Sequence, residues 1–319
     1  MEDPAIRRIS AIKAFSGSGT TTLYNQFKRP SIRIYTGAVR SLVALILFLP
    51  LPTLGQATPG SPQIVEFASG NLRLKGYLWK PSGAGPFPGV LFNHGSGGAD
   101  PSQTAGMPIG QSAEILAALF LKHGYAFFYP CRRGQGLSAD QGEFIQDALK
   151  KEEAAMGVEG RQKLNFALLT GPHLDDTLAA LSFLKTTPGI DAQRIAVVGH
   201  SFGGSLILLD IERDSSVRAA VTFAAAANSW AKSPELRECL LAAAKKAKVP
   251  ILLIQATNDY DTTPGRELAA ELERLDKRHL LKIYPPVGKT SDEGHNIVYN
   301  SIPLWEGDVF EFLDKNVRR

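Results

Sequence analysis

The 319-residue sequence contains few cysteines, no long apolar run and little net charge, and each of these excludes a class of protein. Two cysteines, Cys131 and Cys239, are too few for a disulfide scaffold, and unpaired buried thiols are the favoured interpretation. The apolar run at residues 42–49 is far shorter than the roughly 20 residues that cross a bilayer. No H-E-x-x-H or C-x-x-C motif occurs, so we expect neither a bound metal nor another cofactor.

The small net charge of +4 comes from the first 57 residues. There, seven Lys and Arg side chains are opposed only by Glu2 and Asp3, so residues 58–319 carry one more acidic than basic side chain. A basic pI alone suggests nucleic acid or a membrane surface as a partner. Because the basic excess lies in residues 1–57, the pI gives no reason to expect the rest of the chain to bind nucleic acid. We therefore expect no nucleic-acid partner.

Residues 1–57 have the parts of an export leader. Arg33 and Arg40 precede the apolar run, and Gly55 and Ala57 are the small residues of a cleavage site. We therefore expect a signal peptide cut near Ala57, a secreted or periplasmic mature protein and no stable membrane anchor. Residues 1–30 exceed what a signal peptide needs, which suggests a mis-assigned start. An uncleaved anchor or an N-terminal helix is the alternative interpretation.

After residue 58, strand-like and helix-like segments alternate. Such alternation predicts βαβ units and an α/β fold, with a mostly parallel eight-stranded sheet and helices on both faces. No second compositional block appears, so residues 58–319 are expected to form one domain. The expected strands are 64–67, 72–79, 90–93, 125–129, 195–198, 219–226, 249–255 and 280–284, and the expected helices are 112–122, 174–184, 202–211, 234–246, 265–275 and 304–315.

A polar insertion at residues 138–170 interrupts this alternation. Its place on the C-terminal side of the sheet predicts a lid, with a solvated helical excursion as the alternative. The segments 97–110, 138–170 and 227–233 are expected to shape the pocket. Met107, Phe144 and Trp230 are its expected apolar lining.

The strongest chemical motif is G-x-S-x-G at residues 199–203. The apolar segment RIAVVG enters it and the helix-forming segment SLILLDIE leaves it, as in a nucleophile elbow. A tight strand-to-helix turn would expose the hydroxyl of Ser201 and leave the next N–H free. A merely structural glycine-rich turn is the alternative.

A serine nucleophile needs a base and an acid that orients the base. Among six histidines, His295 lies in the loop after the last predicted strand, where this fold requires its base. The acid should lie between Ser201 and His295, at a strand end, and Asp259 follows the segment ILLIQA. Asp261 is the second candidate, and Asp292 is too close in sequence to be preferred.

An oxyanion requires two N–H donors. One should be the N–H of Phe202, directly after the nucleophile. The other should come from the loop HGSGG that follows the segment VLFN, at Ser96. A flexible loop is the alternative interpretation of HGSGG.

Five segments, VLFNHGSGG, YPCRRGQGLS, RIAVVGHSFGG, ILLIQATNDYDTTP and DEGHN, closely resemble the α/β-hydrolase superfamily and, within it, the dienelactone-hydrolase-like group. The resemblance covers residues 64–315 and implies the α/β-hydrolase fold. Dienelactone hydrolases proper use a cysteine nucleophile, so Ser201 marks a serine variant. The resemblance also implies that residues 132–136 form a structural turn near the pocket, with binding of a substrate carboxylate by an arginine as the alternative.

Together these features predict a serine hydrolase that cleaves a carboxylic ester or a related acyl substrate through an acyl-enzyme. Its partner would be a small-molecule acyl substrate. The alternatives are a small exopeptidase of the prolyl-oligopeptidase type and a non-catalytic binding protein on a hydrolase scaffold.

Overall fold

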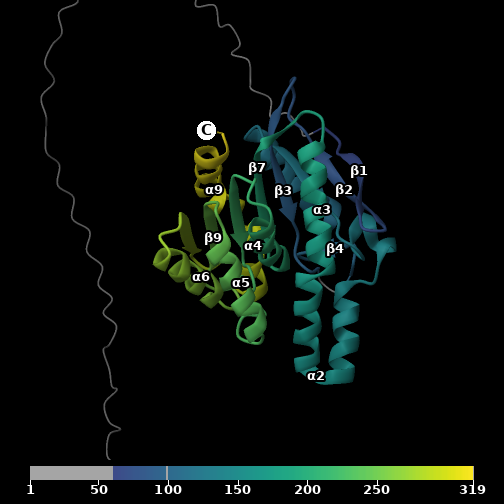
Figure 1. The fold of residues 1–319 in the computed structure, drawn as a ribbon, viewed down its shortest axis with the longest axis vertical. Coiled ribbons are helices and arrows are strands. Elements are labelled where there is room, and N and C mark those ends of the chain that lie inside the picture. The colour runs from purple at the N-terminus through teal and green to yellow at the C-terminus, as the bar shows by residue number, and fades with distance from the viewer. Residues whose placement is uncertain (1–59, 98–99, 319) are drawn as a thin grey trace, which may run out of the picture. The chain divides into compact units, whose positions relative to one another are not determined.

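The computed structural model describes residues 60–97 and 100–318 (Figure 1). The predicted leader, residues 1–57, lies outside them, so its signal peptide and cleavage site stay predictions. Within the described ranges, no helix combines the length and the apolar character that a bilayer span requires.

The core of the fold is an eight-stranded sheet in the order β1-β2-β6-β3-β7-β8-β9-β10. From β6 to β10 every neighbouring pair is parallel, and only the pairs β1–β2 and β2–β6 at one edge are antiparallel. This confirms the predicted mostly parallel sheet. The strands are β1 (Gln63–Ser69), β2 (Leu72–Trp79), β3 (Phe87–Asn93), β6 (Ala126–Pro130), β7 (Ile190–His200), β8 (Ala219–Phe223), β9 (Ile251–Ala256) and β10 (His279–Tyr284), with β4 (Gln103–Thr104) and β5 (Met107–Pro108) forming a separate two-stranded sheet.

Helices cover both faces of the sheet, which the sequence also predicts. Two apolar clusters result: one packs α3, α4, α5 and α6 on one face, and the other packs α1, α8 and α9 on the opposite face. The helical elements are α1 (Ile109–Lys122), η1 (Gly136–Gln141), α2 (Ile145–Thr170), α3 (Pro172–Thr186), α4 (Phe202–Arg213), α5 (Pro234–Lys246), α6 (Thr263–Arg274), α7 (Ser291–His295), α8 (Ile297–Asn300) and α9 (Ile302–Val317).

The central strands are buried on both faces, and this explains their continuous apolar sequence. In β9, Leu252 contacts one cluster and Leu253 the other, and both side chains are buried. Successive side chains of a strand point to opposite faces, so a strand covered on both sides needs apolar residues at every position.

One predicted strand is too long. The alanine-rich segment was expected to continue to residue 226, but β8 ends at Phe223. The reason is local, because Ala224 and Ala226 have φ values of 54° and 57°, a left-handed conformation that ends an extended strand. The chain turns there into the segment that borders the pocket.

The predicted insertion at residues 138–170 consists of the end of η1, a short connection and α2. Gly157, with φ of 70°, divides α2 into two helical segments, which lie side by side in Figure 1. Arg161 in the second segment donates hydrogen bonds to Glu153 and Gln146 in the first, 3.2 Å each. The insertion is therefore a helical hairpin, and its function as a lid stays a prediction.

Candidate active site

Ser201 occupies a strained turn between β7 and α4. Its φ of 55° and ψ of −118° lie in a region that L-residues rarely adopt, and its N–H donates to Phe223 O at 2.8 Å. The glycines of the motif are required by space. A Cβ on Gly203 would lie 2.0 Å from Asn93 O, and a Cβ on Gly199 would lie 2.3 Å from Gly203 O. The sharp strand-to-helix turn predicted from G-x-S-x-G is present.

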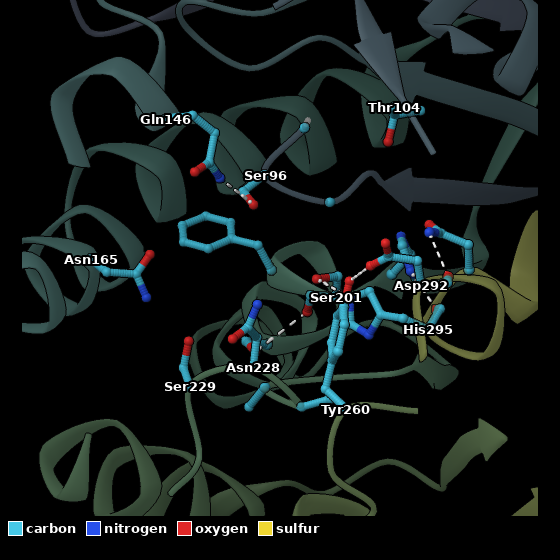
Figure 2. Close-up of a pocket in the computed structure, with 18 of the residues that line it drawn as sticks. Ser96, Thr104, Gln146, Asn165, Ser201, Asn228, Ser229, Tyr260, Asp292 and His295 are labelled. Atoms are coloured by element: carbon cyan, nitrogen blue, oxygen red, sulfur yellow. Dashed lines mark hydrogen bonds between the residues drawn. The ribbon is translucent and has the colours of Figure 1, made fainter. Parts of the chain in front are cut away.

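Three side chains from distant parts of the chain form one hydrogen-bonded row, and two of them, Ser201 and His295, are labelled in Figure 2. His295 Nε2 lies 2.8 Å from Ser201 Oγ, and His295 Nδ1 lies 2.7 Å from Asp259 Oδ1. A carboxylate only accepts, so Nδ1 must carry the proton and donate it to Asp259. Nε2 is then left as an acceptor for the Ser201 hydroxyl, which is the arrangement that a general base requires.

The loop after β9 fixes Asp259. Gln255 Nε2 donates to its Oδ2 at 3.0 Å, and the Tyr260 N–H donates to its Oδ1 at 2.7 Å. The other two candidate acids bond elsewhere. Asp261 Oδ1 accepts the Thr263 N–H at 2.8 Å, at the start of α6, and Asp292 accepts the phenol of Tyr260.

His295 is positioned by the short helix α7. Its N-terminus has a capping box, in which Thr290 Oγ1 accepts the Glu293 N–H and Glu293 accepts the Thr290 N–H. Asn258 ties this segment to the β9 loop, because its Nδ2 donates to the carbonyls of Val287 and Thr290 at 2.9 and 2.8 Å. The loops that carry Asp259 and His295 are thus linked to each other.

The predicted oxyanion donors lie next to Ser201. A Cβ on Gly95 would be 3.4 Å from Ser201 Cβ, so the HGSGG loop contacts the nucleophile. Arg132 donates to Gly95 O at 2.7 Å. The Gly95 carbonyl and the Ser96 N–H belong to one trans peptide and point in opposite directions. Because the carbonyl faces Arg132, the Ser96 N–H faces away from Arg132. Neither that N–H nor the Phe202 N–H donates a hydrogen bond to another described residue.

Arg132 supports this loop and does not face the pocket. It is 1% exposed, and it also donates to His94 O at 2.8 Å. Burial lowers the pKa of its guanidinium to about 10, so it stays protonated at neutral pH. Arg133 instead pairs with the buried carboxylate of Asp176 at 2.6 Å. The structural turn implied by the family resemblance is confirmed, and carboxylate binding by Arg132 is not supported.

Three other histidines near the site are buried and neutral. Burial lowers the pKa of His200 to about 3 and places the pKa values of His94 and His173 well below the ordinary range. His200 nevertheless assists the site, because its Nε2–H donates to His295 O at 2.9 Å. Its place beside the nucleophile in the motif was the only sequence signal for this contact.

Tyr260 and Gln146 were missed in the sequence. The Tyr260 ring lies 4.5 Å from that of His295, centroid to centroid, and its hydroxyl bonds to Asp292. Gln146 Nε2 donates to Ser96 Oγ at 2.9 Å (Figure 2). Adjacency to Asp259 could have identified Tyr260, whereas Gln146 carries no local signal.

The row of three side chains opens into a pocket of about 640 Å³. The segments predicted to shape it do so, since residues 97, 104–106, 146–169 and 227–232 contribute to its walls. The predicted apolar lining is wrong: Met107, Phe144 and Trp230 do not line it. Phe144 and Trp230 are buried in the core, where Trp230 Nε1 donates to Glu267 at 3.1 Å.

The cysteines take no part in the site. Cys131 and Cys239 are both free, as the sequence predicts; Cys131 is buried and Cys239 half-buried. Burial raises the pKa of the Cys131 thiol to about 12. Among residues 60–97 and 100–318, no three His, Cys, Asp or Glu side chains are grouped to hold a metal ion.

Sequence comparisons find one family and one distant curated relative. The model of the dienelactone hydrolase family matches residues 74–300. The quorum-quenching protein AidA of Acinetobacter baumannii (strain MDR-ZJ06) is 26% identical over 164 residues. That match covers 51% of this chain and 44% of AidA, so the chain spans less than half the length of this relative.

Solved structures show the same fold at low identity. An acylaminoacyl peptidase of Pyrococcus horikoshii aligns with a TM-score of 0.59 and 19% identity, over 83% of this chain and 43% of its own. A dienelactone hydrolase of Anabaena variabilis gives 0.54 and 19%, over 81% of this chain and all of its own. An esterase of Pyrococcus furiosus gives 0.55 and 16%, over 80% and 90%. The α/β-hydrolase fold is thereby confirmed.

Proposed function

Because this chain belongs to the dienelactone hydrolase family, we propose that it is a serine hydrolase that cleaves a carboxylic ester or a related acyl substrate. The observation that carries the proposal is the hydrogen-bonded row of Ser201, His295 and Asp259, which opens into the pocket. Three groups in this order activate a hydroxyl that is otherwise a weak nucleophile.

The proposed reaction has two stages. In the first, Ser201 Oγ attacks the ester carbonyl while its proton passes to His295 Nε2, and the N–H groups of Ser96 and Phe202 hold the oxyanion. His295 then gives the proton to the leaving alcohol as the carbon–oxygen bond of the ester breaks. In the second stage, water attacks the acyl-enzyme, His295 takes one water proton and returns it to Ser201, and the acid is released.

A small exopeptidase is the second candidate. Its support is the fold shared with an acylaminoacyl peptidase, of which this chain covers 43%. The same three side chains would serve an amide, with an amine as the leaving group. A non-catalytic binding protein is the third interpretation, and the strained, hydrogen-bonded Ser201 disfavours it. The predicted leader supports a secreted or periplasmic place of action for each of them.

A substrate screen tests this proposal. We expect the protein to hydrolyse p-nitrophenyl esters, measured by p-nitrophenol release over acyl chains of two to twelve carbons, and to be much slower on aminoacyl p-nitroanilides. Faster release from the anilides would favour the exopeptidase. No release from either series, by a protein that is folded by circular dichroism, would contradict the serine-hydrolase proposal.

A further inference from the structure

The pocket in front of Ser201 is lined mostly by polar side chains, although apolar lining was expected. Six of them are uncharged carboxamides, which come from α2, from the segment after β8 and from the residues after α7. They are Gln146, Gln162, Asn165, Asn228, Asn296 and Asn300. Four of the six bond to other described residues of the protein, but Gln162 and Asn165 do not. An acyl chain made only of methylene groups would desolvate these two without giving them hydrogen bonds, which is unfavourable.

The two cations of the pocket already have partners within the protein. Arg161 lies 3.2 Å from a carboxylate oxygen of Glu153 and 3.2 Å from Gln146 Oε1. Lys232 Nζ donates to Asn228 Oδ1 at 2.9 Å. An anionic ligand group would have to compete with these contacts.

The two carboxylates of the pocket are also engaged. Asp292 accepts the hydroxyl of Tyr260. Glu293 accepts the N–H groups of Lys289 and Thr290, at 2.7 and 2.9 Å, in the cap of α7. With two cations and two anions, each already bonded, the pocket offers no excess charge to a charged ligand.

The second half of α2 presents polar atoms that lack partners. Arg161, Gln162, Asn165 and Leu169 all line the pocket, at spacings that place them on one side of the helix. Gln162 Oε1 is buried and accepts no hydrogen bond from the described residues. Figure 2 shows Asn165 extending from its helix toward the pocket, and no described residue bonds to its carboxamide. The Oε1 of Gln162 faces the protein, so the groups open to a ligand in the pocket are Nε2 of Gln162 and the carboxamide of Asn165, which no described residue bonds.

We propose that Gln162 and Asn165 form a wall that binds neutral hydrogen-bonding groups, hydroxyl or amide, of the substrate. The inference rests on the proposed serine-hydrolase function, because it names the substrate class of that site. A hydroxyl both donates and accepts, so it can accept from Gln162 Nε2 and donate to Asn165 Oδ1. The wall therefore selects hydroxylated or amide-bearing esters over aliphatic esters of similar size.

Matched ester pairs test this selection. One pair varies the acyl part (methyl 3,4-dihydroxybutanoate and methyl butanoate), and one varies the alcohol (glyceryl and butyl butanoate). N-acetylglycine methyl ester provides the amide arm. We expect kcat/KM to be about fivefold higher for the polar member of at least one pair, or for the amide ester relative to methyl butanoate, as one added hydrogen bond provides. The arm that gives the preference identifies hydroxyl or amide as the bound group.

The double variant Gln162→Leu with Asn165→Leu should remove this preference. The kcat/KM of the polar ester divided by that of its aliphatic partner should then be close to one. Lys163→Leu is the matched control, because Lys163 neighbours Gln162 on α2 but is exposed and does not line the pocket. It should leave the ratio as in the parent. A ratio near one in the parent, or an unchanged ratio in the double variant, would overturn the inference.

Equilibrium binding separates this inference from the proposed function. In Ser201→Ala, calorimetry with the same esters measures affinity without turnover. A preference for the polar esters that the double substitution abolishes supports the wall even if the parent hydrolyses no ester, in which case only the serine-hydrolase proposal fails. Equal affinities within every pair would overturn the wall, whatever the turnover.

Discussion

Replacing Ser201 with alanine is expected to lower kcat for every ester that the protein hydrolyses by a factor on the order of 10⁶, as loss of a serine nucleophile does elsewhere. The substitution removes only Oγ, the atom that lies 2.8 Å from His295 Nε2. No other described hydroxyl bonds to that nitrogen. The measurement is steady-state release of p-nitrophenol at saturating substrate.

Ser182→Ala is the control for this result. Ser182 is exposed on α3, away from the pocket, so the variant removes a serine hydroxyl and should keep the parent kcat. Circular dichroism and the midpoint of thermal unfolding should match the parent for both variants. If Ser201→Ala retained more than about a tenth of the parent kcat while folded, another residue would be the nucleophile.

The second large effect is expected at Asp259. Asp259→Asn should lower kcat by roughly 10⁴ with little change in unfolding midpoint, because the new amide can donate to His295 Nδ1. The imidazole then carries its proton on Nε2, where it no longer accepts the proton of Ser201. Steady-state kcat with p-nitrophenyl esters measures the loss.

Asp261→Asn is the matched control for Asp259→Asn. Among the residues that the structure describes, the Asp261 carboxylate accepts only the Thr263 N–H, by its Oδ1, and an asparagine oxygen can accept the same bond. We expect its kcat to stay within about threefold of the parent. A larger loss at position 261 than at position 259 would reverse the assignment of the acid.

Strand and helix positions could be predicted because burial on both faces leaves a strong pattern. Strand β9 is apolar at each position from Ile251 to Ile254, and α5 has the bounds that its sequence predicts. The fold sets the order of Ser201, Asp259 and His295 along the chain. The three side chains can meet because the ends of parallel strands lie at one edge of the sheet. These parts of the site depend on local motifs and strand order.

The individual side chains that line the pocket could not be predicted, because they depend on how the insertion folds. Residues 145–170 are polar enough to suggest a solvated segment, yet the left-handed Gly157 doubles the helix back and carries Gln162 and Asn165 to the pocket. Phe144 and Trp230 were expected in the lining because they are apolar, and for the same reason they are buried in the core. Composition therefore indicates burial but not which cavity a side chain faces.

The most direct test of the central claim, that Ser201 is an activated nucleophile, is the site of a covalent adduct. Incubation with a fluorophosphonate, followed by intact mass and peptide mass spectrometry, should show one phosphonyl group on each molecule, bonded to Ser201 Oγ with loss of fluoride. Ser201→Ala should take up none. A folded parent protein that stays unlabelled, or an adduct on a residue other than Ser201, would contradict the account.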